Sequence, residues 1–267
     1  IGVTMRFGIQ EDTEQGRTSC CSLESVENAR RVANQLGIPF YTVNYEAIFR
    51  KEIVNYFCEE YSSGRTPNPC IICNEKLKFG KLLTLAEELD ASYIATGHYA
   101  RILYDNRLAR YLLKKGIDNK KDQSYALFSL KQEQLRHILT PLGDYTKTQV
   151  RNIAKSLSLK TAQRPESQEL CFISDIDYNK FLQRHISEKI KPGPIVDKEG
   201  KVLGQHKGIQ YYTIGQRKRL GGNLGKTMYV IRIDADENTI VVGEKKDLLV
   251  EKLTASGANF ISIPRLE

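Results

Sequence analysis

The chain has 267 residues, of which 40 % are hydrophobic and 27 % are charged, with a formal net charge of +8. This composition is typical of a soluble globular protein of one large or two ordinary domains, and no apolar run is long enough for a transmembrane helix. The positive charge favours an acidic partner such as nucleic acid, although a merely soluble basic protein has the same balance.

The first half of the chain alternates strands and helices. The residue pattern predicts strands over 1–5, 38–44 and 92–96, and helices over 22–37, 46–61 and 74–89. This rhythm is typical of an α/β fold, with a parallel sheet covered by helices on both faces. Because ligands bind beyond the carboxyl ends of parallel strands, we expect Met5–Phe7 and Gly97–Tyr99 to border a common crevice.

The residue pattern of the second half changes from helical to β-rich near Asp177. Before it, a helical stretch is predicted over 122–134 and a helix over 146–157, with a capping box between Thr146 and Gln149. After it, the pattern predicts a hairpin over 193–204, a glycine-rich basic run over 206–222, and two strands over 227–243 joined by an acidic turn. The second part is therefore expected to be smaller, β-rich and basic.

Cys70 and Cys73 form a C-x-x-C pair in a proline-rich turn. The pair alone is compatible with zinc ligands, a redox pair, a nucleophile beside a spectator, or apolar packing. One C-x-x-C cannot close a tetrahedral zinc site, which needs four ligands. A helix that begins at Asn74 would place Cys73 at its N-terminus, where the helix dipole, Lys76 and Lys78 favour a thiolate.

The other cysteines carry weaker signals. Cys171 stands alone before Phe172 and by itself indicates a core cysteine, and we assign Cys20, Cys21 and Cys58 to packing. Six cysteines are too few for a secreted disulfide scaffold, and no signal peptide is visible. We therefore predict a reducing, cytoplasmic setting and no membrane partner.

Two polar stretches are candidates for contacts with phosphates or bases. Gly97 and His98 follow a predicted strand, where a glycine lets a ligand approach the backbone closely. In "NKKDQSYAL", the lysines Lys120 and Lys121 suit phosphates, whereas the two residues after them suit base or sugar edges, namely Asp122 and Gln123. A hydrogen-bonded turn histidine and a solvated helix start are the alternatives.

Eight stretches between Gly2 and Gly243 occur in the order typical of one family. The chain resembles the tRNA-specific 2-thiouridylase family, which forms 2-thiouridine at the wobble position of certain tRNAs. This resemblance implies an adenine nucleotide alpha hydrolase-like, Rossmann-like catalytic domain followed by a small β-rich domain. The matching stretches are "GVTMR", "GRTPNPCIICNEKLKFG", "YIATGHYAR", "KDQSYAL", "PLGDYTKTQVR", "SQELCFI", "GPIVDKEGKVLGQHKGIQYYTIGQRKRLG" and "YVIRIDADENTIVVG".

The resemblance also implies a chemistry for two cysteines. ATP, with Mg²⁺ expected, adenylates the 2-oxo group of the uridine, and a cysteine persulfide then supplies the sulfur. Cys73 matches the family nucleophile, and Cys171 matches the persulfide-carrying cysteine. A sulfur-donor protein, either a persulfide relay or a cysteine desulfurase, is the expected partner besides tRNA.

The remaining site residues are implied by position in the matching stretches. Met5 and Gly97 match ATP contacts. The residues that match the lining of the target base or other tRNA contacts are Asn68, Pro69, Cys70, His98, Lys121, Asp122 and Gln123. A further hypothesis is an iron–sulfur cluster held by Cys70, Cys73 and Cys171, because three thiolates leave one iron open.

The resemblance implies three domains and two departures from the family pattern. The expected domains are an ATP-pyrophosphatase-like catalytic domain over 1–176, a central tRNA-binding domain over 177–246, and the start of a C-terminal β-barrel over 247–267. The family's phosphate loop should precede "GVTMR", so we expect an excerpt of a longer protein with little adenylation by itself. The alternative function is a tRNA-binding fragment without catalysis.

Overall fold

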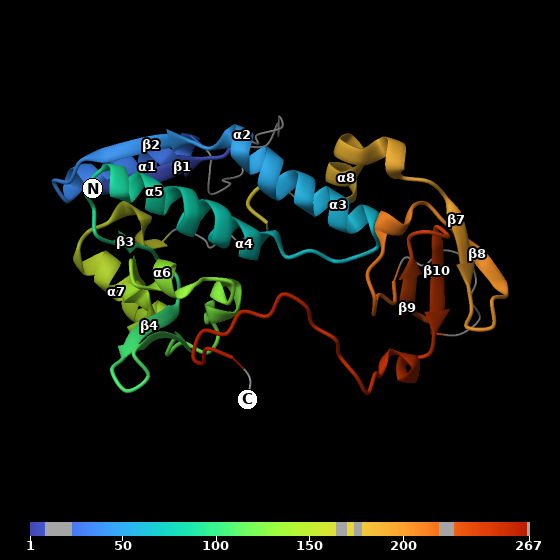
Figure 1. Cartoon of the computed structure of the whole chain (residues 1–267). Coiled ribbons are helices and arrows are strands. Elements are labelled where there is room, and N and C mark those ends of the chain that lie inside the picture. The colour runs from blue at the N-terminus through green and yellow to red at the C-terminus, as the bar shows by residue number, and fades with distance from the viewer. Residues whose placement is uncertain (9–22, 164–169, 174–177, 219–226, 266–267) are drawn as a thin grey trace. The chain divides into compact units, whose positions relative to one another are not determined.

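The fold was analysed in a computed structural model that describes residues 1–8, 23–163, 170–173, 178–218 and 227–265 (Figure 1). The chain divides into two compact units. Unit 1 contains residues 1–53, 69–172 and 257–267, and unit 2 contains residues 54–68 and 173–256. The domain bounds expected from the sequence stay a prediction, and the boundary at 176 lies outside the described residues.

Unit 1 contains two pairs of parallel strands. β1 (Gly2–Arg6) pairs with β2 (Phe40–Asn44), and β3 (Ile94–Ala95) pairs with β6 (Ile138–Leu139). Helix α1 (Leu23–Gln35) packs on both β1 and β2. Its apolar face buries Val26 and Ala33, as the helical spacing of these residues predicts. The predicted α/β fold with parallel strands is confirmed.

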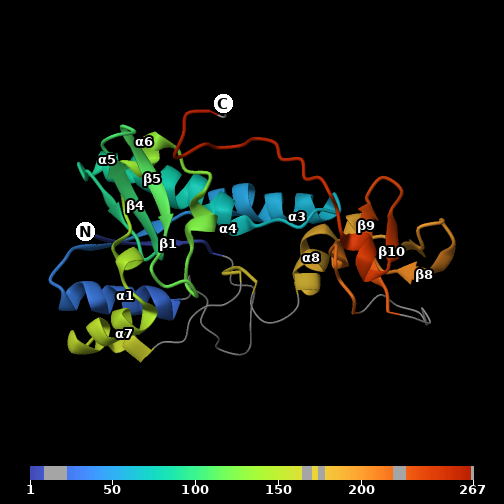
Figure 2. The ribbon, with the colours of Figure 1, turned by 90° about the horizontal axis from the view of Figure 1, so that it is seen from below.

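An antiparallel hairpin that the sequence analysis did not identify follows β3 directly. β4 (Ala100–Asp105) and β5 (Arg110–Lys115) lie side by side in Figure 2 and are joined by a short turn. The hairpin packs against a buried apolar cluster of unit 1, which contains Phe79, Ala100, Leu127, Leu130, Leu135 and Ile138.

Two long helical runs each contain a π-helical segment. The first consists of α2 (Glu46–Phe49), a π-helix over Arg50–Val54 and α3 (Asn55–Ser62), which agrees with the predicted helix. The second consists of α4 (Pro69–Ile72), a π-helix over Cys73–Lys81 and α5 (Leu82–Glu88). The predicted start at Asn74 is therefore wrong. Proline lacks a backbone N–H and suits the first turn of a helix, so the run begins at Pro69.

Apolar side chains at the end of this second run border a cavity of about 330 Å³. The cavity lies between β1, α5 and β3, because each contributes lining residues. These residues include Val3, Leu82, Leu85, Ala86, Leu89 and Ile94.

The helix predicted over 122–134 is also wrong. A 3₁₀-helix spans Ser124–Leu127, and the short α6 spans Gln132–Leu135. The Asp122 carboxylate accepts hydrogen bonds from Ser124 and Gly116, which favours a turn over a continuous helix. By contrast, α7 (Lys147–Ser156) starts with the predicted capping box between Thr146 and Gln149. Further 3₁₀ turns span Pro141–Asp144 and Lys160–Gln163.

Unit 2 is β-rich, as predicted. Its sheet has the order β8-β7-β10-β9, and it contains the two predicted hairpins. The central pair, β7 and β10, is parallel. The strands are β7 (Gly193–Val196), β8 (Val202–His206), β9 (Tyr229–Asp234) and β10 (Thr239–Gly243), with α8 (Tyr178–Ile186) before them and 3₁₀ turns at Ser187–Lys189, Ile209–Tyr211 and Lys245–Leu248.

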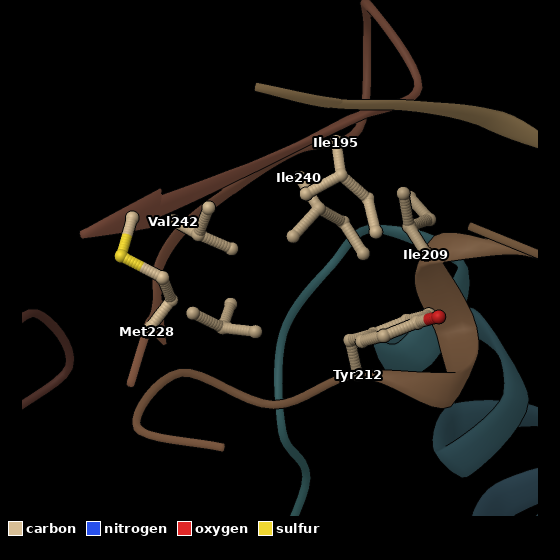
Figure 3. Packing of buried hydrophobic residues seen from close by; sticks show 7 residues of the cluster. Ile195, Ile209, Tyr212, Met228, Ile240 and Val242 are labelled. Carbon is tan, nitrogen blue, oxygen red and sulfur yellow. The ribbon is translucent and has the colours of Figure 1, made fainter. Parts of the chain in front are cut away.

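An apolar cluster of buried residues packs against this sheet of unit 2. Figure 3 shows Ile195 and Ile240 side by side, with Ile209 of the 3₁₀ turn and Tyr212 directly after it facing them. Met228, Val230 and Val242 complete the cluster. The cluster joins β7, β9, β10 and the 3₁₀ turn, so its buried side chains stabilise the packing of these elements on one another.

Ile240→Ala is expected to destabilise unit 2 by about 2–5 kcal/mol, because Ile240 is fully buried and its truncation leaves a cavity. Urea unfolding followed by circular dichroism measures the change. Val202→Ala is the matched control, since Val202 lies in the same sheet but is 63 % exposed, and it should change stability by at most about 0.5 kcal/mol. Equal effects of the two variants would contradict this core assignment.

Candidate active site

Cys73 is buried inside a helix. It is the fifth residue of the helical run that opens at Pro69, and it is 6 % exposed, whereas Cys70 is exposed one turn earlier. The predicted position of Cys73 at a helix N-terminus is therefore wrong. Cys70, in the first turn, occupies that position instead. Burial shields the Cys73 thiol from bulk solvent.

The next residue, Asn74, holds this part of the helix in place. Its Nδ2 donates a hydrogen bond of 2.9 Å to the carbonyl oxygen of Ala126, and its side chain is 1 % exposed. Its Oδ1 has no hydrogen-bond partner among the described residues. The sequence analysis missed Asn74. The available signal was an asparagine between Cys73 and the apolar Leu77, at a helix position that faces the core.

An ion pair ties this helix to the other π-helical segment. Lys76 Nζ lies 2.5 Å from Glu52 Oε2, and the hydrogen bond and charge of Lys76 lower the pKa of the Glu52 carboxyl. Such π-helical segments are rare and occur frequently at functional sites. Glu52 lies in the π-helix Arg50–Val54 and Lys76 lies in the π-helix Cys73–Lys81, so the ion pair links the two π-helical segments.

Cys171 is anchored by its neighbour. The buried Phe172 packs edge-on against Phe49 at 5.6 Å between ring centroids, and Phe49 stacks on Phe7 at 4.4 Å. Phe7 directly follows β1, so Cys171 lies near the carboxyl end of this parallel strand. Its side chain is half-buried, unlike that of a fully packed core cysteine.

The two cysteine segments therefore share one attachment. Phe49 contacts the residue after Cys171, and Glu52, less than one turn later, pairs with Lys76. The segments that carry Cys73 and Cys171 therefore both contact the helical stretch Phe49–Glu52. Both are thiols, as are Cys70 and Cys58.

The remaining cysteines divide by position. Cys58 is buried in unit 2, and burial raises the pKa of its thiol to about 11, which fits the packing role predicted for it. Cys20 and Cys21 lie outside the described residues.

Gly97 and His98 follow β3 at the sheet edge where the crevice was expected. Gly97 is exposed, and a Cβ there would meet only Leu142 at 3.5 Å, so packing alone does not require a glycine. His98 Nδ1 lies 2.9 Å from Thr96 Oγ1. Burial, followed by the charge of Lys78, lowers the pKa of His98 to about 3, so its imidazole is neutral at pH 7.

Asp122 and Gln123 use their side chains within the loop. Asp122 accepts from the Gly116 amide and the Ser124 hydroxyl, each at 2.9 Å. Gln123 Oε1 accepts from the Tyr99 amide at 3.1 Å. These bonds form a structured turn rather than the solvated helix start given as the alternative, and a tRNA contact by either side chain stays a prediction.

Other predicted site residues have varied settings. Met5 is half-buried within β1, Asn68 is exposed, and Pro69 is buried where it opens the helical run. Lys121 is half-buried, and its amide donates to Asp118 in a turn. Their roles stay predictions.

Among the described residues, no three His, Cys, Asp or Glu side chains gather as a metal site requires. The iron–sulfur hypothesis for Cys70, Cys73 and Cys171 is therefore unsupported. In the same part of the chain, every helix is too short or too polar to cross a bilayer.

The chain was compared with known proteins. Residues 1–175 match the family model described as "tRNA methyl transferase HUP domain", and residues 179–244 match "tRNA methyl transferase PRC-barrel domain". The chain is 52 % identical over 269 residues to the tRNA-specific 2-thiouridylase MnmA of Acetivibrio thermocellus, covering 100 % of this chain and 75 % of the relative. The chain belongs to the tRNA-specific 2-thiouridylase family.

Two further relatives are equally similar. The MnmA of Clostridioides difficile is 50 % identical over 267 residues, which are 100 % of this chain and 74 % of the relative. That of Moorella thermoacetica is 52 % identical over 263 residues, which are 98 % and 73 % of the two chains. The family consists of tRNA-uridine 2-sulfurtransferases, so this chain is an enzyme. The HUP and PRC-barrel matches confirm the predicted fold class, and the HUP domain fits an enzyme that uses ATP.

Proposed function

We propose that this protein replaces the 2-oxygen of the wobble uridine in tRNA with sulfur. The observation that carries the proposal is that two residues close in sequence to the cysteines contact the same helical stretch, Phe49–Glu52: Phe172, beside Cys171, and Lys76, three residues after Cys73. The two cysteines are 98 positions apart in sequence, so only tertiary folding can bring their thiols into one reaction. Membership in the 2-thiouridylase family supports the same reaction.

In the proposed reaction, sulfur reaches the uridine from a cysteine persulfide. Cys171 carries the sulfur as a persulfide, received from a sulfur-donor protein. ATP supplies the activation of the uridine 2-oxo group, which then leaves with AMP and its electron pair. The terminal persulfide sulfur forms the new bond to C2.

Cys73 completes the reaction. Its thiolate attacks the Cys171 sulfur, so the sulfur–sulfur bond breaks and its electron pair moves to the sulfur on the base. The products are 2-thiouridine and a Cys73–Cys171 disulfide, which a cellular thiol reduces before the next turnover. The burial of Cys73 protects this thiol from competing oxidants.

Binding roles are assigned to the sheet edge and to the loops beside it. Met5 and Gly97 would hold ATP, with Mg²⁺, at the carboxyl ends of β1 and β3, where the open space at Gly97 fits a close ligand. The proposed tRNA contacts are Asn68, Pro69, Cys70, His98, Lys121, Asp122 and Gln123. Because His98 is neutral, its contact would be a hydrogen bond rather than an ion pair. A cytoplasmic location is part of this proposal, and it is compatible with a reaction on tRNA that consumes ATP.

Nucleoside mass spectrometry tests the proposal. The intact protein is incubated with unmodified tRNA, ATP and a persulfide donor, with ATP omitted as the control. The expected product is 2-thiouridine at the wobble position, formed only with ATP. A methylated nucleoside would instead indicate a tRNA methyltransferase. Binding of tRNA without any modified nucleoside would indicate a binding module.

A further inference from the structure

Two aromatic side chains are exposed beside the helix that carries Cys73. Tyr125 is 61 % exposed and Phe128 is 49 % exposed, whereas Ala126 and Leu127 between them are buried. They lie in and directly after the 3₁₀-helix Ser124–Leu127. In a 3₁₀-helix, residues three apart share a face. Tyr125 and Phe128 therefore present their rings on one outward face, and we call this pair the aromatic face.

Hydrogen bonds fix the backbone beneath the aromatic face at both ends. Asn74 Nδ2 donates to the Ala126 carbonyl at 2.9 Å, which links this turn to the residue after Cys73. Asn259 Nδ2 donates to the carbonyls of Phe128 and Leu130 at 2.8 and 2.9 Å. The rings consequently occupy a set position near the thiol helix.

Basic side chains lie on the strand that contacts this 3₁₀-helix and on the loop that leads to it. Lys114, Lys115 and Lys120 are exposed on β5 and on the loop that leads to Tyr125. The carboxylates nearby are engaged by the protein itself: Asp118 accepts from the amides of Lys120 and Lys147. Exposed aromatic rings next to lysines are typical of surfaces that bind single-stranded nucleic acid, where bases stack on the rings.

We propose that Tyr125 and Phe128 form a stacking platform for unpaired bases that flank the target uridine in an RNA loop. This inference rests on the proposed function, because an RNA whose uridine reaches Cys73 must present its loop bases unstacked. The ligand class is an unstacked nucleobase of single-stranded RNA. A sulfur-donor protein is the competing occupant of the same face.

Tyr125→Ala is expected to weaken binding of an RNA stem–loop by roughly 5- to 150-fold, the cost of one lost base–aromatic contact. Tyr125→Phe should bind like the wild type, because the ring remains. Tyr93→Ala is the matched control, since Tyr93 is 56 % exposed in the same unit but precedes β3 at the opposite strand end. Fluorescence anisotropy at several salt concentrations measures each affinity. The salt slope should not change for Tyr125→Ala, whereas Lys120→Ala should reduce it.

Abasic substitutions in the RNA loop identify the stacked base. At one flanking position, the abasic change and Tyr125→Ala should cost no more together than either change alone. Additive losses at every loop position, or wild-type affinity of Tyr125→Ala, would overturn the platform. Wild-type RNA affinity with lost sulfur delivery from a donor protein would also overturn it, in favour of the donor. A wild-type protein that forms no 2-thiouridine would instead reject the proposed function.

Discussion

Cys73→Ser is expected to stop 2-thiouridine formation while tRNA binding is retained. A serine hydroxyl is protonated and weakly nucleophilic at neutral pH, so it cannot break the sulfur–sulfur bond at Cys171. A loss of about three orders of magnitude or more is typical when a nucleophile is removed. The measurement is nucleoside mass spectrometry after single-turnover reactions without added thiols.

The same variant should trap an intermediate. If the persulfide sulfur bonds to C2 before Cys73 acts, Cys73→Ser leaves tRNA joined to Cys171 through a disulfide that a small thiol releases. Denaturing gels with and without that thiol detect the adduct. Cys58→Ala is the control, because Cys58 is buried in the other unit and should leave turnover unchanged. Normal turnover by Cys73→Ser would contradict the assignment of Cys73.

Local patterns predicted most elements of this fold. Strand 1–5, helix 22–37 and the capped helix at Thr146 agree with the structure because apolar spacing and capping act within one element. The hairpins of unit 2 were also evident from alternating residues and turn signals. The parallel pairing of β7 with β10 was not evident, because it joins segments far apart in the chain.

The two wrong helix predictions, at Asn74 and at Asp122, arose where one residue is compatible with two local structures. Pro69 looked like part of a turn, yet it begins the helix, and this moves Cys73 from the helix N-terminus into a buried turn. Asp122 looked like a helix start, but its bonds to Gly116 and Ser124 favour a 3₁₀ turn. The proline ring suits either a turn or the first turn of a helix, and the aspartate suits either a helix start or a hydrogen-bonded turn. Only tertiary packing decides between these structures.

The cysteines of the candidate site could be named from the sequence, but the contacts that bring their segments together could not. From spacing alone, Cys171 resembled a core cysteine, and only the family resemblance suggested chemistry. The structure adds the physical link: Phe172, the residue after Cys171, packs against Phe49, and the Lys76–Glu52 pair ties the Cys73 helix to the same helical stretch. An aromatic pair and an ion pair between distant segments have no sequence signature.

Cys171→Ser is expected to abolish 2-thiouridine formation at an earlier step than Cys73→Ser. Without the Cys171 thiol the protein cannot hold the transferred sulfur, so no covalent tRNA adduct forms, and labelled sulfur from a persulfide donor does not stay on the protein. Mass spectrometry of the intact protein measures the bound sulfur. Cys73→Ser should retain it, which separates the two roles.

The two variants together test the order of events. Because Phe172 rather than Cys171 makes the contact with Phe49, Cys171→Ser should keep the fold and the tRNA affinity of the wild type. Persulfide on Cys73 in the Cys171→Ser variant would reverse the assigned roles, and adduct formation by that variant would do the same. If both variants instead lose sulfur loading, Cys73 takes part in receiving sulfur as well as in releasing it, and the shared anchor at Phe49–Glu52 would serve both steps.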